Sequence, residues 1–212
     1  MNIIVIGGGA AGLMAAGTAA EQGANVTLFE TNEKVGRKLF ITGKGRCNVC
    51  NDCDAQEVLR NVPVNPRFLY SALGAFSPAD VKAFFEEKGV ALKTERGNRV
   101  FPVSDRASDI IDALFLWVRR TGVSIIHASV SDLIMQDGRV TGVRAGKKTC
   151  LADRVIVATG GASYPQTGST GDGYRFAREA GHSVVPANPS LVPLVESGET
   201  GRSLMGLSLR NV

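Results

Sequence analysis

Three glycines near the start of the chain have the spacing of a phosphate-binding turn. Gly7, Gly9 and Gly12 form a G-x-G-x-x-G pattern, and the acidic residue Glu30 follows 18 positions after Gly12. The first glycine permits a tight turn, the second lets the backbone approach a pyrophosphate, and the third lets a helix pack closely on a strand. A carboxylate at this distance accepts hydrogen bonds from ribose hydroxyls and repels a 2′-phosphate. The pattern predicts a site for adenosine without that phosphate.

The elements around these residues support this interpretation. Asn2–Ile6 is a short β-branched run typical of a buried parallel strand, residues 10–23 read as a helix rich in small side chains, and Asn25–Glu30 reads as a second strand. The start of such a helix offers free N–H groups and a positive dipole end to an anion. A glycine-rich turn without a ligand is the alternative, and the strand–turn–helix–strand context favours the nucleotide.

The segment after the second strand favours FAD over NAD. Residues 32–51, NEKVGRKLFITGKGRCNVCN, are rich in Gly, Lys and Arg and do not suit a crossover helix. A dehydrogenase would continue here with further βαβ units. A segment of this kind can instead wrap an extended cofactor, so we expect FAD.

The cysteines raise a second kind of chemistry. Cys47, Cys50 and Cys53 form a C-x-x-C-x-x-C pattern, a spacing that can ligate zinc or an iron–sulfur cluster. A fourth ligand is missing nearby, since Cys150 and both histidines are far away in the sequence. We therefore expect ordinary intracellular thiols and no metal, with a redox disulfide between neighbours as a lesser alternative.

The rest of the chain predicts a doubly wound α/β domain. Helices are expected over residues 67–76, 78–89 and 109–120, with Ser77 capping the second and Ser104 or Asp105 the third. Two short strands are expected within residues 89–102, a third parallel strand over 123–128, and a returning buried strand over 154–161. Between the last two, turns at Asp137-Gly138 and Gly146-Lys147 predict a three-stranded β-meander as the crossover.

Composition excludes several other classes. The 212 residues are 44% apolar and 21% charged, which is ordinary for a globular domain. The net charge of +4 is weak and spread along the chain, so no nucleic-acid partner is expected. No membrane span is expected, and only Met1 and Asn2 precede the first apolar run, which lacks the basic start of a secretion signal. We expect a cytoplasmic location.

Four segments are distinctive when they are taken together, namely IGGGAAGLMAA, GRKLFITGKGRCNVCN, RVIVATGGASYPQTGSTGDGY and AGHSVVPANPSLVPL. Their combination resembles a known family, the bacterial HI0933-like flavoproteins, also described as BaiN-type or aminoacetone-oxidase-type NAD(P)/FAD-dependent oxidoreductases. The resemblance covers nearly the whole chain, and the second segment is far more specific than the glycine pattern. It implies a glutathione-reductase-like Rossmann FAD-binding domain with a β-meander crossover.

The resemblance also implies which residues bind the cofactor. Gly7, Gly9, Ala10, Ala11 and Gly12 would hold the pyrophosphate, and Glu30 the adenosine ribose. The remaining contacts would be Arg37, Lys38, Thr42, Gly43 and Gly45 along the extended cofactor, Arg46, Cys47 and Asn48 towards the flavin, the backbone of Val130 at adenine, and Ala158, Thr159 and Gly160 closing over FAD. One departure is Cys50, where the family usually has Thr or Ser. No catalytic residue is assigned.

A later segment, STGDGYRFAREAG, resembles part of the fumarate reductases and aspartate oxidases. Asp172 is expected to cap the following helix, and the segment either contacts the cofactor or is a structural turn. Tyr164 either faces the flavin or packs in its loop. His127 is expected to be structural, and His182 to lie at a helix end.

The function expected is that of an FAD-dependent oxidoreductase, which transfers a hydride between a small organic substrate or NAD(P)H and the flavin. Oxidase and reductase both stay open, and the oligomeric state is not predicted. The alternative is a non-enzymatic flavin-binding redox module or a sensor built on the cysteine cluster. The resemblance implies an FAD-binding domain over residues 1–190, without its C-terminal return, and the start of an inserted substrate domain over 191–212. Such a portion is expected to be inactive alone.

Overall fold

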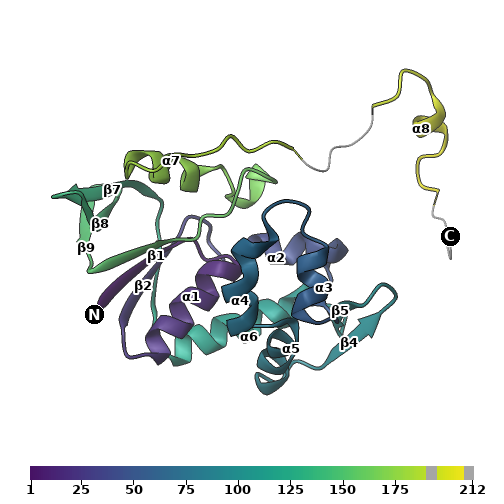
Figure 1. Ribbon diagram of the computed structural model, residues 1–212, viewed down its shortest axis with the longest axis horizontal. Coiled ribbons are helices and arrows are strands. Elements are labelled where there is room, and N and C mark those ends of the chain that lie inside the picture. The colour runs from purple at the N-terminus through teal and green to yellow at the C-terminus, as the bar shows by residue number, and fades with distance from the viewer. Residues whose placement is uncertain (190–194, 208–212) are drawn as a thin grey trace.

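The centre of the molecule is a parallel sheet of four strands. The computed structural model describes residues 1–189 and 195–207, and within them this sheet has the order β10-β1-β2-β6 (Figure 1). Its strands are β1 (Asn2–Ile6), β2 (Asn25–Glu30), β6 (Ser124–His127) and β10 (Arg154–Val157). Val5 lies beside Leu28 of β2 and Ile156 of β10. The predicted third and returning strands are confirmed as the two edges of the sheet.

The two faces of this sheet are covered by different layers. Val5 packs with residues of helices α1 (Ala10–Glu21) and α6 (Ala107–Arg120), whereas Ile4 and Ile6 pack with residues of the β-meander. Successive strand side chains point to opposite faces, so a strand that is covered on both sides is apolar at every position. This explains the uninterrupted run from Ile3 to Ile6, and it gives a helix–sheet–sheet sandwich (Figure 1).

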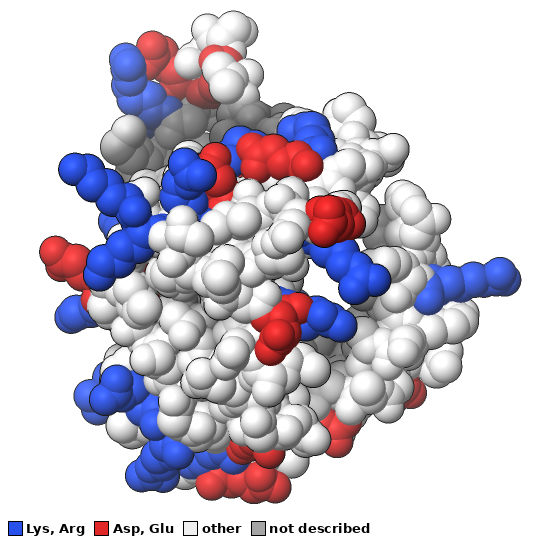
Figure 2. Space-filling model, turned by 90° about the vertical axis from the view of Figure 1, so that its left-hand side faces the viewer, with Lys and Arg blue, Asp and Glu red and all other residues white. Residues whose placement is uncertain are grey.

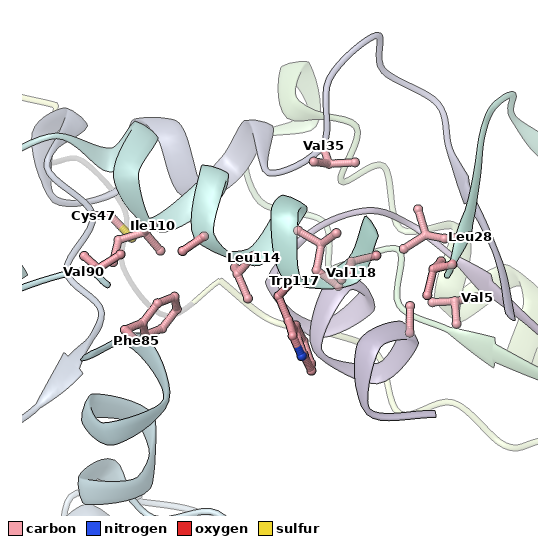
Figure 3. Packing of buried hydrophobic residues seen from close by; sticks show 14 of the residues in the cluster. Val5, Leu28, Val35, Cys47, Phe85, Val90, Ile110, Leu114, Trp117 and Val118 are labelled. Atoms are coloured by element: carbon pink, nitrogen blue, oxygen red, sulfur yellow. The ribbon is translucent and has the colours of Figure 1, made fainter. Parts of the chain in front are cut away.

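Helices α1 and α6 pack closely because one of them carries small residues. A Cβ added at Gly17 would lie 2.4 Å from the ring of Trp117, so only glycine admits the indole at this point. The indole Nε1 donates to Glu21 Oε1 at 2.6 Å. Figure 3 shows Leu114, Trp117 and Val118 along one side of α6, with the tryptophan against α1. The predicted core role of Trp117 is confirmed by its 6% exposure.

The β-meander forms the second sheet. Its strands are β7 (Val130–Gln136), β8 (Arg139–Ala145) and β9 (Lys148–Leu151), paired antiparallel in that order. Asp137 and Gly138 have φ angles of 49° and 72°, the left-handed backbone that a two-residue hairpin turn requires. The meander crossover and both of its turns are confirmed.

A third, smaller sheet and several short helices lie between β2 and α6 in the sequence. The sheet contains β3 (Cys50–Asn51), β4 (Leu92–Glu95) and β5 (Arg99–Pro102), and the helices are α2 (Arg37–Ile41), α3 (Ala55–Arg60), α4 (Tyr70–Ala75) and α5 (Pro78–Glu87), with 3₁₀ turns at Thr42–Gly45 and Pro66–Leu69. Ser77 caps α5 as predicted, since its hydroxyl accepts from the Asp80 N–H and the Asp80 carboxylate accepts from the Ser77 N–H. The helix expected over 67–76 is divided between a 3₁₀ turn and α4. Helix α3 was not predicted.

The predicted cap of α6 is wrong. The helix begins at Ala107, and within the described residues no side chain caps it from position 106. Asp105 has a left-handed backbone with φ 56°, and its carboxylate pairs with Lys93 and Arg46. Ser104 instead donates to Asp109 Oδ2 at 2.6 Å. The two side chains therefore make other contacts than the capping bond.

The predicted cap of the last long helix, α7 (Asp172–Glu179), is also wrong. Gly171, with φ 86°, occupies the cap position, and Asp172 is the first helical residue. The Asp172 carboxylate accepts from Thr170 Oγ1 at 2.6 Å and pairs with Arg175 at 3.1 Å. A 3₁₀ turn, Pro165–Thr167, precedes α7, and the short α8 (Thr200–Ser203) follows it. The predicted domain boundary at residues 190–191, and much of PSLVPL and GLSLRNV, lie outside the described residues.

Candidate functional site

The turn between β1 and α1 is tightly constrained by its glycines. Gly7 has φ 104°, and a Cβ there would lie 2.5 Å from the Ala158 carbonyl oxygen. A Cβ at Gly12 would lie 1.8 Å from the Gly7 carbonyl oxygen, whereas one at Gly9 would meet no atom of the described residues within 4 Å. Gly7 and Gly12 therefore hold strand, turn and helix together, and Gly9 leaves open space beside the backbone.

A cavity of about 710 Å³ opens at this turn, at the carboxyl ends of β1, β2 and β10. We call it the main cavity. The predicted residues that line it are Gly7, Gly9, Ala10, Ala11, Glu30, Arg37, Lys38, Thr42, Val130, Ala158, Thr159 and Gly160. They come from segments far apart in the sequence, and the parallel sheet brings them together because its strands end at one edge. Whether they bind a cofactor stays a prediction.

Helix α1 presents its N-terminus to the main cavity. Its cap position is Gly9, and in the described part of the chain no side chain bonds to its first turn and no acidic residue lies there. The amide groups at the start of a helix lack partners within the helix and carry its positive dipole end. This end of the cavity is therefore suited to an anion.

Glu30 supplies a carboxylate to the same cavity. It is 7% exposed, and its Oε2 accepts from the Gly8 N–H at 2.6 Å. Its Oε1 accepts from the backbone N–H and the side-chain amide of Asn32, at 2.7 and 2.6 Å. Three donors compensate the burial of the group, which therefore stays available as an acceptor of hydrogen bonds.

Thr159 is another polar side chain in the wall of the main cavity. Its Oγ1 is buried and has no hydrogen-bond partner among residues 1–189 and 195–207. A buried hydroxyl without a partner costs free energy. A Cβ built at Gly173 would lie 3.0 Å from this oxygen, so the hydroxyl is enclosed beside α7 and does not face the main cavity.

Hydrogen bonds at the rim of the main cavity connect segments that are distant in the sequence. Lys38 Nζ, on α2, donates to the Ser163 carbonyl oxygen at 2.8 Å. Asn32 Nδ2 donates to the Thr167 carbonyl oxygen at 3.2 Å, and Arg37 donates to Asn32 Oδ1 at 2.8 Å. The loop after β10 is thus tied to the loop after β2.

Sequence reasoning missed several residues of the main cavity. Asn32 and Thr167 were not singled out, although a polar side chain two positions after the strand-ending acid was a usable signal. Asp172 and Gly173 also line the cavity, which places the TGDG segment at the site. Tyr164 does not line it and is 60% exposed. His127 Nδ1 donates to the Asn32 carbonyl oxygen, 2.8 Å away.

Six predicted cofactor residues lie away from the main cavity, namely Gly12, Gly43, Gly45, Arg46, Cys47 and Asn48. Gly12 lies against the Gly7 carbonyl oxygen, so it stabilises the turn without lining the cavity. Cys47 and Asn48 line a neighbouring apolar cavity of about 160 Å³, which shares Ala10 and Leu39 with the main one. Cys47 is 1% exposed, and burial raises the pKa of its thiol.

Arg46 is held by acidic side chains of another segment. Its guanidinium pairs with Glu95 at 2.9 Å and with Asp105 at 3.1 Å, and it lies 4.0 Å from the centre of the Phe101 ring. Lys93 joins the same cluster through Asp105 at 2.7 Å. This ion cluster fastens the loop of residues 42–48 to the hairpin of β4 and β5.

The ion cluster predicts a pH-dependent stability. A hydrogen bond from Arg46 lowers the pKa of Glu95, and one from Lys93 lowers the pKa of Asp105. Because these folded-state pKa values lie below the unfolded ones, the stabilisation is complete above pH 4.5 and is lost as pH falls through the lowered values. We expect Arg46→Met to lower the urea midpoint at pH 7, with a much smaller difference at about pH 2. Arg60→Met, which breaks one isolated helical pair with Glu57, is the control and should change the pH 7 midpoint less. Equal losses at both pH values would contradict the assignment.

The three cysteines of the C-x-x-C-x-x-C motif differ in their burial, since Cys47 is buried and the other two are only partly so. Cys50 and Cys53 are half-buried, all four cysteines are free thiols, and the described residues contain no group of three or more potential metal ligands. Burial raises the pKa of Cys50 to about 11, so this thiol is protonated at neutral pH. The expected absence of a metal stays a prediction.

The sheet order, the glycine turn and the β-meander define a Rossmann-type α/β domain, and the predicted fold class is confirmed. A family model described as "HI0933-like protein Rossmann domain" matches residues 1–211. The chain belongs to this family.

Curated relatives agree with this membership. The chain is 36% identical over 197 residues to the 3-dehydro-bile acid delta(4,6)-reductase of Clostridium scindens, covering 92% of this chain and 47% of the relative. It is 33% identical over 213 residues to the ribosomal RNA dihydrouridine synthase of Haemophilus influenzae, covering 97% of this chain and 52% of the relative. The chain thus spans about half the length of these relatives.

Solved structures share the fold at low identity. Mycobacterium smegmatis Sdh1 matches with a TM-score of 0.61 and 21% identity, covering 84% of this chain and 38% of that protein. The L-proline dehydrogenase from P. horikoshii matches with a TM-score of 0.56 and 15% identity, covering 85% of this chain and 55% of that protein.

In the part of the chain that the structure describes, no helix has the length and apolar character needed to cross a membrane.

Proposed function

We propose that the chain forms the FAD-binding part of a flavin-dependent oxidoreductase. The observation that carries the proposal is the convergence of two groups on one cavity: the N-terminus of α1 and the Glu30 carboxylate. A pyrophosphate matches the helix end, and ribose hydroxyls match the carboxylate. The volume of about 710 Å³ is of the size expected for a cofactor site.

Each residue of the site has a task in this proposal. The amide groups of Gly9, Ala10 and Ala11 would bind the pyrophosphate, and Glu30 the adenosine ribose. Val130 would meet adenine through its backbone, and Ala158, Thr159 and Gly160 would close over FAD. Lys38 and Ser163 join the two sides of the rim.

FAD, when bound, would supply a two-electron hydride carrier. The side chains of this chain would orient it and shield one part of it from solvent. We propose NADH or NADPH as the electron donor and a small organic molecule as the acceptor. The names of the two relatives both concern reduction of a carbon–carbon double bond, which favours a reductase over an oxidase.

The test starts with the cofactor. The purified protein is expected to be yellow, and after heat denaturation the colour should stay in the supernatant. A protein that contains no FAD and cannot be reconstituted with it would overturn the proposal. Stopped-flow mixing then separates the two enzyme classes: bleaching of the flavin by NADH or NADPH supports a reductase, and bleaching by an amine under nitrogen supports an oxidase.

RNA is a second candidate substrate, favoured by the relatives named as ribosomal RNA dihydrouridine synthases. The sequence predicts no nucleic-acid partner, and the comparisons leave that prediction open. The face in Figure 2 carries basic and acidic groups intermixed with uncharged surface, which does not favour a broad RNA-binding patch there. Turnover with a uridine-containing RNA and with an unsaturated ketone, under the same donor, distinguishes the two substrates.

A further inference from the structure

Asn32, in the loop after β2, connects the segments that surround one end of the main cavity. Its N–H and side-chain amide donate to Glu30 Oε1 at 2.7 and 2.6 Å, and the amide also donates to the Thr167 carbonyl oxygen at 3.2 Å. Its Oδ1 accepts from Arg37 at 2.8 Å. Its carbonyl oxygen lies 2.8 Å from His127 Nδ1. Asn32 thus contacts Glu30, Arg37 and, across the cavity, the turn that contains Thr167.

The bonds to Glu30 determine what this carboxylate can still accept. A carboxylate has about four acceptor positions, two on each oxygen. Asn32 fills both positions of Oε1, and the Gly8 N–H at 2.6 Å fills one of Oε2. A single position on Oε2 is left for a molecule in the cavity. Asn32 therefore decides which oxygen of Glu30 faces the ligand.

Arg37 gives this arrangement an electrostatic consequence. Its guanidinium donates to Asn32 Oδ1 and not to the nearby Glu30 carboxylate. If the amide were absent, the carboxylate would lose a donor and the guanidinium a partner, so the two opposite charges would attract each other directly. Such a pair would draw the carboxylate towards Arg37 and away from the orientation that presents Oε2 to the cavity.

Asn32 also holds the opposite wall of the cavity. A Cβ at Gly168, which has φ 94°, would lie only 3.0 Å from Asn32 Nδ2. The loop can approach the amide because this position is glycine. The bond to Thr167 then joins residues 135 positions apart in the sequence.

We propose that Asn32 is a positioning residue: it orients Glu30 towards the adenosine ribose, keeps Arg37 away from that carboxylate, and ties the Thr167 turn across the site. The inference rests on the proposed function, because the ribose is that of FAD. It predicts that Asn32 acts through Glu30, so that the effects of changing the two residues are not additive.

The experiment is a double-mutant cycle on cofactor binding. FAD and ADP are titrated into wild-type protein, Asn32→Ala, Glu30→Gln and the double variant, with each variant's fold checked by circular dichroism. Asn32→Ala should weaken both ligands about tenfold, the loss of one hydrogen bond to a charged group. In the Glu30→Gln background it should cause little further loss. Asn32→Asp, which keeps the acceptor for Arg37 but removes the donor to Glu30, should bind no better than Asn32→Ala.

The matched control is Asn61→Ala. Asn61 also donates to a glutamate carboxylate, Glu57 at 2.9 Å, but on an exposed helix end away from the main cavity. This variant should bind FAD as the wild type does. Wild-type affinity in Asn32→Ala, or additive losses in the double variant, would overturn the role of Asn32 while leaving FAD binding intact. Failure of the wild type itself to bind FAD and ADP would reject the proposed function, and this assignment with it.

Discussion

Replacing Gly12 by alanine is expected to unfold the β1–α1 unit and to abolish FAD binding. The new Cβ would lie 1.8 Å from the Gly7 carbonyl oxygen, far inside van der Waals contact. The carbonyl cannot give way easily, because Gly7 donates to the Phe29 carbonyl oxygen at 2.8 Å and itself packs against Ala158. Relief therefore requires α1 to move away from the sheet. Overpacking against fixed backbone should cost at least about 3 kcal/mol, a large part of the stability of a domain.

The matched control makes the same chemical change where there is space. Gly74 lies in α4, and a Cβ there would meet no atom of the described residues within 4 Å. Gly74→Ala should stabilise the folded state by about 0.5–1 kcal/mol, because alanine restricts the unfolded chain and favours the helix. Urea unfolding of both variants, with FAD titration, measures the contrast. A Gly12→Ala protein as stable as the wild type would show that Gly12 and the Gly7 carbonyl oxygen are not in close contact.

The parts of the site that were predictable depend on local chemistry. Gly7 and Gly12 had to be glycine because of the turn that they form, and Glu30 ended a strand at a fixed distance from them. The meander was equally visible, because its turn at Asp137-Gly138 needs a left-handed backbone that few residues adopt. In each case the requirement and the residue that meets it lie within one short segment.

The parts that were missed depend on partners far away in the sequence. The ion pairs of Arg46 were not predicted, because its acidic partners Glu95 and Asp105 lie 49 and 59 positions further along the chain. Asn32 meets Thr167 across 135 positions. No spacing rule links such pairs, because the sheet order that joins them is a property of the whole fold. The wrong cap at Asp105 has the same cause, since its carboxylate is already engaged by the ion cluster.

Replacing Glu30 by glutamine is expected to weaken FAD binding severely and to destabilise the protein. Oε2 accepts from the Gly8 N–H, and Oε1 accepts from two N–H donors of Asn32, so both positions need an acceptor. An amide offers one oxygen and one NH₂ group. Either orientation therefore places a donor against a donor in a side chain that is 7% exposed. The cost of an unsatisfied buried polar group is about 1–3 kcal/mol, before the lost bond to ribose is added.

Cys50→Ser provides the comparison for Glu30→Gln in the same titration. The Cys50 thiol is half-buried and makes one weak contact, 3.9 Å to the Pro78 carbonyl oxygen, which a serine hydroxyl can also make. This change restores the hydroxyl that the family resemblance implies at this position, and it should alter FAD affinity less than threefold, or about 0.7 kcal/mol. Glu30→Gln should lose at least about a hundredfold, since a charge-assisted bond and the pairing of its donors are both removed. Equal affinities in the two variants would mean that Glu30 does not face the ribose, and the observed bonds to Gly8 and Asn32 would then be its entire role.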